Sequence, residues 1–210
     1  AVVFNVHPSA KNVSLYNIGL INATIKEAGG PDNLLTTIAE PTVESAQQLM
    51  RHKDVRLLVV TGGAGVVKEA MTSGKRAICA GPGNPPVVVD ETADIEQAAK
   101  GIISGASLDN NIICVDEKEV FVVASVADKL LATFTHFDAV VLKPQQISQL
   151  EKVIFSENLG PGKPAVMNKN YIGKNAKVIL EQIGITVEDK IRLVIAPVTV
   201  EHPLVWSEQM

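Results

Sequence analysis

The sequence contains little cysteine and few aromatic residues. It has two cysteines in 210 residues, and phenylalanine, tryptophan and tyrosine together make up 4%. Two cysteines cannot form the disulfide framework that is typical of small secreted domains, so we expect a reducing, cytoplasmic compartment. With so few aromatic rings, the stacking surfaces that bind single-stranded nucleic acid are not expected either.

Long apolar runs and an excess of positive charge are also absent. No run approaches the roughly 18–20 apolar residues that cross a bilayer, and no signal peptide opens the chain. The 19 lysines and arginines are outnumbered by 23 aspartates and glutamates, which gives a net charge of −4. Nucleic acid or a membrane surface would require a basic face, so the sequence predicts neither partner.

What is present is enough apolar material for a core, since 46% of the residues are hydrophobic and 20% are charged. Apolar runs alternate with segments of helical periodicity, which is typical of βαβ units and a mostly parallel sheet. The expected strands are 1–6, 34–38, 57–60, 77–79, 87–89, 120–123, 140–142 and 193–195, and the expected helices include 42–50, 95–107, 126–137, 147–155 and 171–183.

Several local signals set the boundaries of these elements. Gly29-Gly30-Pro31 is expected to end the first helix, because glycine tolerates a left-handed cap and proline cannot continue a helix. Asp94 is a candidate cap for the helix that follows it. The run Leu57–Val60 has no polar alternation, which predicts a strand buried on both faces. The apolar start, Ala1–Phe4, is expected to be a core strand as well.

The segment from Gly81 to Pro86 interrupts the alternation. Its glycines and prolines exclude regular structure and predict a hinge or a domain crossover. The expected organisation is therefore two α/β units, residues 1–84 and residues 85–210.

A glycine-rich turn follows the strand at 57–60. Thr61, Gly62 and Gly63 lead into a helix, and bare backbone N–H groups at a helix N-terminus can hold a phosphate. The turn matches neither the dinucleotide fingerprint nor the P-loop pattern. A tight strand-to-helix turn without a ligand is the alternative.

Cys114 lies in a polar segment between a predicted helix and a predicted strand. A partly exposed loop cysteine near amide N–H groups can act as a nucleophile, although many free cysteines are simply small buried hydrophobes. Cys79 lies in an apolar run and is expected to be such a hydrophobe. The four histidines are dispersed and the cysteines are far apart, so no metal site is expected.

The order of these motifs is the most specific feature of the sequence. Gly-Asn-Pro-Pro-Val-Val-Val-Asp-Glu-Thr-Ala-Asp begins at Gly83, and Asp-Asn-Asn-Ile-Ile-Cys ends at Cys114. With the earlier strand that closes on Thr61, these motifs resemble the CoA-acylating branch of the aldehyde dehydrogenase superfamily. The resemblance covers the whole chain and implies an internal portion of a longer enzyme.

The resemblance implies an α/β fold with a partial Rossmann-like nucleotide-binding domain and a catalytic domain of the aldehyde dehydrogenase fold. It implies that Cys114 is the nucleophile and that Thr61, Gly62 and Gly63 contact the phosphates of NAD. His7 and Pro8 occupy the place of a Lys-Pro pair near the adenosine ribose. Glu208 occupies the place of a glutamate that contacts the nicotinamide ribose, although the sequence from Ser207 to Met210 departs from the family's Glu-x-x-Gly.

One departure bears on the reaction. Hydrolytic members carry a glutamate in a Glu-Leu-Gly-Gly motif that activates water, and Ala80 stands in its place here. Alanine cannot act as a base, so the resemblance implies that a short-chain aldehyde is oxidised and that coenzyme A, rather than water, accepts the acyl group. The alternatives are a hydrolytic aldehyde dehydrogenase and a nucleotide-binding portion without activity of its own.

Relatives of this branch are often cargo of bacterial microcompartments. The resemblance therefore implies a cytoplasmic enzyme, in some hosts inside a microcompartment and next to its shell, that works as a homo-oligomer in its full length. A purely structural or shell-associated protein is a further alternative.

Overall fold

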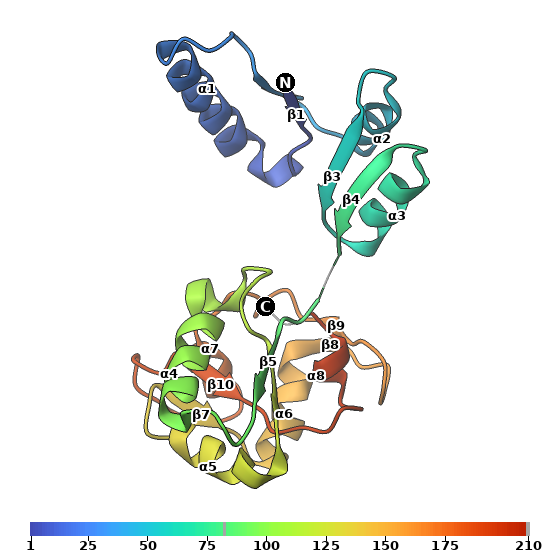
Figure 1. Cartoon of the computed structure of the whole chain (residues 1–210). Coiled ribbons are helices and arrows are strands. Elements are labelled where there is room, and N and C mark those ends of the chain that lie inside the picture. The colour runs from blue at the N-terminus through green and yellow to red at the C-terminus, as the bar shows by residue number, and fades with distance from the viewer. Residues whose placement is uncertain (82, 209–210) are drawn as a thin grey trace. The chain divides into compact units, whose positions relative to one another are not determined.

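The structure is a computed structural model that describes residues 1–81 and 83–208 (Figure 1). It divides the chain into two compact units, Ala1–Gly81 and Pro82–Met210. Each unit is described by itself.

The first unit begins with a small parallel pair. Its elements are β1 (Val2–Phe4), a 3-10 helix η1 (Pro8–Ala10), α1 (Lys11–Glu27) and β2 (Leu35–Thr37). β1 runs parallel to β2, with Val2 opposite Leu35. The side chain of Asn22 in α1 donates to the Leu35 carbonyl at 2.7 Å and accepts from the Leu35 N–H at 3.1 Å. This helix therefore supplies hydrogen-bond partners for the backbone at the start of β2.

The second half of this unit contains α2 (Val43–Arg51), β3 (Leu57–Thr61), α3 (Ala64–Thr72) and β4 (Arg76–Ala80). β3 and β4 are parallel and in register from end to end, so Thr61 lies opposite Ala80. A capping box between Thr42 and Ser45 starts α2. The expected glycine-containing termination of α1 is confirmed, because Gly29 adopts φ +81°.

The prediction that 57–60 is buried on both faces is wrong. Leu58 is 7% exposed but Val59 is 73% exposed. Successive side chains of a strand point to opposite faces, so packing within the chain covers only one face of β3. The predicted core strand at the start is exposed too, since every residue of β1 is exposed.

The second unit holds the larger part of the fold. Its elements are β5 (Pro86–Val89), α4 (Ile95–Ala106), a 3-10 segment η2 (Leu108–Asn111), β6 (Glu119–Val122), α5 (Ala124–Phe134), β7 (Ala139–Val141), α6 (Pro144–Ile154), β8 (Phe155–Glu157), β9 (Val166–Met167), α7 (Ala176–Glu181), β10 (Leu193–Ile195) and α8 (Pro203–Trp206). β5 pairs with β6 and β7 pairs with β10, both in parallel, whereas β8 and β9 form an antiparallel pair. The expected α/β class with parallel pairing is confirmed.

Two apolar clusters hold this unit together. One packs α4 and α5 against the ends of β5 and β7 and contains Leu130 and Phe134, each 1% exposed. The other joins α6 to Leu180 of α7 and Leu204 of α8. Burial of such a side chain stabilises the fold by about 1.5–3 kcal/mol relative to leaving it in water. Asp94 caps α4 as predicted, accepting from the Gln97 N–H at 3.0 Å.

The expected helix at 171–183 is shorter in the structure, where α7 spans Ala176–Glu181. Gly173 interrupts the pattern with φ +68°, a left-handed conformation that a continuous right-handed helix excludes. No helix in the described part of the chain combines the length and the hydropathy needed to cross a membrane.

Candidate active site

The glycine-rich turn lies at the carboxyl end of β3. Thr61 is the last residue of that strand, and the Gly62 N–H donates to the Ala80 carbonyl of β4 at 3.2 Å. Gly63 is the N-cap of α3 and makes no side-chain capping bond. A Cβ built on Gly63 or Gly65 would meet no atom within 4 Å. Bare backbone at the start of a nine-residue helix therefore leaves room for an approaching phosphate, and these residues fit the pyrophosphate of a dinucleotide.

His7 and Pro8 follow β1, one strand of the other parallel pair of the same unit. Both are exposed, and His7 Nδ1 accepts from the Ser9 N–H at 3.2 Å while Pro8 begins η1. The structure assigns β1–β2 and β3–β4 to separate two-stranded sheets. It therefore does not pair the strand before His7 with the strand before Thr61.

Cys114 lies in the second unit on a tight turn between η2 and β6. The Asp116 N–H donates to the Ile113 carbonyl at 3.1 Å and closes the turn around the cysteine. Cys114 is exposed, whereas Cys79 is half-buried in β4. An exposed thiol on a turn is accessible to a substrate carbonyl.

The chain reaches this turn through three consecutive residues of left-handed backbone. Asp109, Asn110 and Asn111 have φ of 46°, 55° and 64°. Such a run is costly for residues with a Cβ, and asparagine and aspartate are the residues that best tolerate it. The Asn111 amide donates to the Ala106 carbonyl at 2.6 Å and to the Glu117 carbonyl at 3.1 Å, which stabilises the run.

Lys118 follows the turn and was not singled out by the sequence analysis. Its ammonium donates to the Asn111 carbonyl at 2.6 Å and to Asn111 Oδ1 at 2.7 Å. Burial lowers the pKa of Lys118 below its usual value, and the coulombic effects of Asp116, Glu208 and Cys114 oppose that shift. Lys118 therefore joins the residue before β6 to the left-handed run that precedes the cysteine turn. The only sequence signal for it is a lysine four positions after the cysteine.

Glu208 follows α8 and is held by its buried neighbour. Ser207 is 2% exposed, and its hydroxyl accepts from the Ala165 N–H at 2.8 Å and donates to the Pro203 carbonyl at 2.7 Å. The Asn84 amide donates to the Ser207 carbonyl at 2.7 Å and to Glu119 Oε1 at 3.1 Å. Asn84 thus links the segment before β5 to the start of β6 and to Ser207, the residue before Glu208. The remainder of the predicted motif, Gln209 and Met210, lies outside the described residues.

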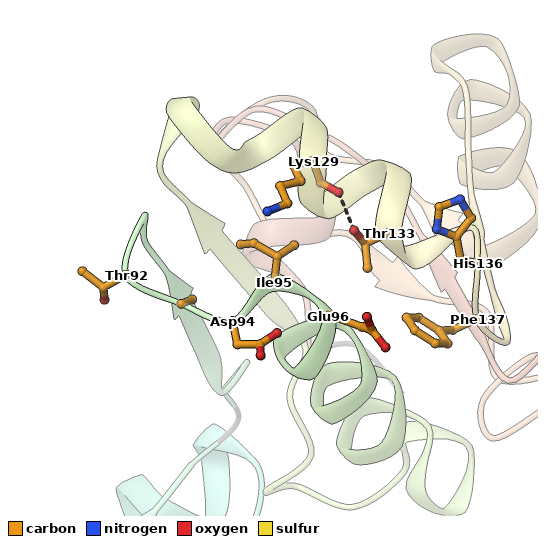
Figure 2. Close-up of a pocket in the computed structure, with 9 residues that line it drawn as sticks. Thr92, Asp94, Ile95, Glu96, Lys129, Thr133, His136 and Phe137 are labelled. Atoms are coloured by element: carbon orange, nitrogen blue, oxygen red, sulfur yellow. Dashed lines mark hydrogen bonds between the residues drawn. The ribbon is translucent and has the colours of Figure 1, made fainter.

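A cavity of about 820 Å³ in the second unit has Asn110, Asn111 and Lys118 in its lining, so it lies beside the cysteine turn. A separate pocket of about 760 Å³ lies between the start of α4 and the end of α5 (Figure 2). Its polar groups are engaged locally, with Thr133 Oγ1 donating to the Lys129 carbonyl at 2.7 Å and Glu96 paired with Lys100 at 2.6 Å. None of the predicted site residues lines this second pocket.

Ala80 ends β4 with an exposed methyl group that can neither accept nor donate a proton. Across residues 1–81 and 83–208, no group of three His, Cys, Asp or Glu side chains is arranged to hold a metal ion.

Comparison with known proteins agrees with this geometry. Residues 4–148 match the profile of the aldehyde dehydrogenase family. The chain is 46% identical over 211 residues to the acetylating acetaldehyde dehydrogenase EutE of Escherichia coli, and the match covers 100% of this chain and 45% of that protein.

Solved structures give the same result. A propionaldehyde dehydrogenase of Rhodopseudomonas palustris with bound propionyl-CoA is 43% identical with a TM-score of 0.87, covering 100% of this chain and 45% of that one. A propionaldehyde dehydrogenase from the fucose utilisation bacterial microcompartment of Clostridium phytofermentans is 40% identical with a TM-score of 0.86, covering 98% and 46%. The chain spans a little under half the length of these relatives. The fold and the family match agree, and the chain belongs to the aldehyde dehydrogenase family.

Proposed function

We propose that this chain is part of a CoA-acylating aldehyde dehydrogenase, which oxidises a short-chain aldehyde with NAD and passes the acyl group from Cys114 to coenzyme A. One observation carries the proposal most directly. The chain combines an exposed cysteine on a tight turn with Ala80 in the place where hydrolytic relatives carry a water-activating glutamate. The relatives that match over the whole chain are named for acetylation or were solved with an acyl-CoA bound, which supports the same reaction class.

In this proposal the Cys114 thiolate attacks the aldehyde carbonyl carbon, and a new S–C bond gives a thiohemiacetal oxyanion. The Cys114 backbone N–H is one donor available to that oxyanion. NAD, when bound, would supply the hydride acceptor, and loss of hydride from the former carbonyl carbon would leave an acyl thioester on Cys114. The thiol of coenzyme A then attacks the thioester as a thiolate, and the Cys114 thiolate departs. The cysteine thus divides one difficult step into two easier ones.

The two units are assigned different tasks. We propose that residues 1–84 are the nucleotide-binding domain and residues 85–210 the catalytic domain. Thr61, Gly62 and Gly63 would hold the phosphates of NAD at the start of α3, with His7 and Pro8 near the adenosine ribose. Glu208 would contact the nicotinamide ribose. The open space beside Gly63 and the unit boundary next to Gly81 support this assignment.

The cellular setting of the full enzyme is also a proposal. The microcompartment origin of the Clostridium phytofermentans relative supports a cytoplasmic enzyme that is packaged beside a microcompartment shell. We propose that the full enzyme works as a homo-oligomer. Fractionation of microcompartments from the source cells, with immunodetection of this chain, tests the location.

The reaction is tested on the full-length enzyme that contains this chain. We expect rapid NADH formation from propionaldehyde and NAD only when coenzyme A is present, and loss of acyl-CoA formation in Cys114→Ala. Cys79→Ser is the matched control and should retain the parental rate. NADH formation that is equally fast without coenzyme A would instead indicate a hydrolytic enzyme, and nucleotide binding without turnover would indicate a binding role only.

A further inference from the structure

His202 is the N-cap of α8 and contacts α6 through the other edge of its ring. Its Nδ1 accepts from the Leu204 N–H at 3.2 Å, and its Nε2 lies 2.7 Å from Oε1 of Glu151 in the last turn of α6. The side chains of His202 and Glu151 are only 17% and 25% exposed, so water competes little for this contact. One imidazole therefore joins the start of α8 to the end of α6.

The two contacts define the tautomer of the ring. A ring nitrogen that accepts from a backbone N–H carries no proton, so the proton of neutral His202 lies on Nε2 and is donated to Glu151. Both ring nitrogens are satisfied in this tautomer. A hydrogen bond to an ionised carboxylate is about twice as strong as one between neutral groups, so the Glu151 contact is the stronger of the two.

Contacts of this kind matter to α8 because it is only four residues long. A single helical turn fixes several dihedral angles for few hydrogen bonds and is not stable by itself. Its far end is held by Asn84, which donates to the carbonyls of Val205 and Ser207 at 3.3 and 2.7 Å. Between the ends, Leu204 is 8% exposed and packs in the apolar cluster that includes α6. His202 supplies the corresponding anchor at the near end.

This short helix leads directly to Glu208. Only Ser207 separates Glu208 from Trp206, the last residue of α8. Asn84, which holds the Ser207 carbonyl, also donates to Glu119 Oε1 at 3.1 Å at the start of β6. A shift at the start of α8 therefore reaches the segment that carries Glu208 beside the strand that follows the cysteine turn.

We propose that His202 is a positioning residue for Glu208: its ring ties α8 to Glu151 of α6 and so fixes the place from which Glu208 contacts the nicotinamide ribose. The proposal rests on the proposed function, which gives Glu208 that contact. It assigns no chemical step to His202, because the ring acts only through the segment that follows it.

The test uses the full-length enzyme that contains this chain. Hydride transfer is measured as the pre-steady-state rate of NADH formation from propionaldehyde and coenzyme A at saturating NAD. Acyl transfer is measured separately, as the rate at which propionyl-CoA alone acylates Cys114. That reaction needs no nucleotide, so it does not use Glu208.

Four variants separate the contacts. His202→Ala removes both, and Glu151→Ala removes only the contact to α6, so it serves where His202→Ala fails to fold. Glu151→Gln keeps an oxygen that can accept from Nε2. His136→Ala is the matched control, because His136 is an exposed histidine of the same unit.

We expect His202→Ala and Glu151→Ala to lower the rate of NADH formation about ten- to a hundredfold, because a displacement of about 1 Å in a positioned group can cost that much. Their rates of Cys114 acylation should stay close to the parental rate. Glu151→Gln should recover most of the rate of NADH formation, and His136→Ala should keep it. Parental NADH formation in both alanine variants of the pair would overturn the proposal. So would an equal loss in both reactions, because the pair would then maintain the fold rather than the place of Glu208.

Amide hydrogen exchange gives a third readout that needs no substrate. In Glu151→Ala, exchange in the peptide that contains residues 203–208 should rise about tenfold, the order expected for loss of one hydrogen bond to a charged group. The peptide that contains α4 should exchange as in the parent, and unchanged exchange in residues 203–208 would overturn the proposal. Neither this readout nor the rate of hydride transfer depends on which acceptor takes the acyl group, so the proposal and the proposed function can fail separately.

Discussion

Thr61 and Ala80 lie directly opposite each other at the carboxyl ends of β3 and β4. The next N–H along, that of Gly62, donates to the Ala80 carbonyl at 3.2 Å. The residue that stands in place of the family's water-activating glutamate is therefore tied to the turn proposed to hold the phosphates of NAD. A substitution of Thr61 or Ala80 therefore affects the same place, the carboxyl ends of the β3–β4 pair.

The first prediction concerns Ala80. Ala80→Glu in the full-length enzyme should raise the rate of NADH formation without coenzyme A about tenfold, because it restores the glutamate that the resemblance assigns to water activation in hydrolytic relatives. A positioned general base contributes about 10²–10⁴-fold, and a newly introduced one is expected to supply part of that. Ala80→Gln is the control, because glutamine has the shape of glutamate but no carboxylate, and it should leave the rate of NADH formation without coenzyme A unchanged. If both variants behave alike, the side chain at position 80 does not reach the reacting water.

The second prediction concerns the room beside Gly63. Gly63→Val should raise the Kd for NAD about tenfold or more, measured by isothermal titration, because its side chain fills the space left for a phosphate. Gly63 has φ −62°, which valine tolerates, and its Cβ meets no atom within 4 Å, so the melting temperature should change little. Gly19→Ala in α1 is the matched control in the same unit, since its Cβ also meets open space. Unchanged NAD affinity in Gly63→Val would remove this turn from the nucleotide site.

The third prediction concerns the anchor of Glu208. Asn84 donates to the carbonyls of Val205 and Ser207 at 3.3 and 2.7 Å. Asn84→Ala should lower the free energy of unfolding by about 1–3 kcal/mol, because it leaves these carbonyls without that donor. Urea unfolding measures the effect. Asn158→Ala, which removes a contact to the Gly160 N–H in an exposed turn, should cost less than Asn84→Ala.

The fourth prediction concerns pH. The Lys177–Asp189 ion pair, at 2.7 Å, raises the pKa of Lys177 and lowers the pKa of Asp189 through their hydrogen bond and charges. The Asp189 contribution is present above its unfolded value of 3.8 and is lost as pH falls through its lower folded value. The Lys177 contribution is present below 10.5 and is lost as pH rises through its higher folded value.

Lys177→Met should therefore lower the melting temperature slightly at neutral pH and have no such effect well below the ordinary range of an aspartate. Lys190→Met serves as the control, because the partner of Lys190 is the exposed Glu188, two residues away. A melting-temperature difference that persists undiminished in acid would show that the pair does not cause it.

Local chemistry made much of the fold predictable. The end of α1 at Gly29 and the cap of α4 at Asp94 follow from residue types that act within a few positions. The exposure of Val59 does not follow from the sequence. An apolar run predicts that both faces of a strand are apolar, but it does not indicate which segment of the protein covers each face. Periodicity alone predicts a helix over 171–183, but the left-handed backbone of Gly173 restricts α7 to Ala176–Glu181.

Only part of the candidate site could be predicted from the sequence as well. The order of motifs predicts Cys114 and the turn at Thr61 as site residues, and their roles stay predictions. The bond from Asn84 to Ser207 spans 123 residues, and no local pattern announces such a contact. Lys118 is only seven residues from Asn111, but their contact depends on the left-handed backbone at Asn111, which the sequence allows without requiring.

The proposed function depends on the exchange of an acyl group between Cys114 and coenzyme A. Incubation with propionyl-CoA alone, followed by intact-mass and peptide mass spectrometry, tests it without NAD or aldehyde. We predict that one propionyl group is gained on Cys114, that added coenzyme A reverses the gain, and that Cys114→Ala abolishes it while Cys79→Ser does not. A full-length enzyme that gains no acyl group, or gains it equally in Cys114→Ala, would contradict the account.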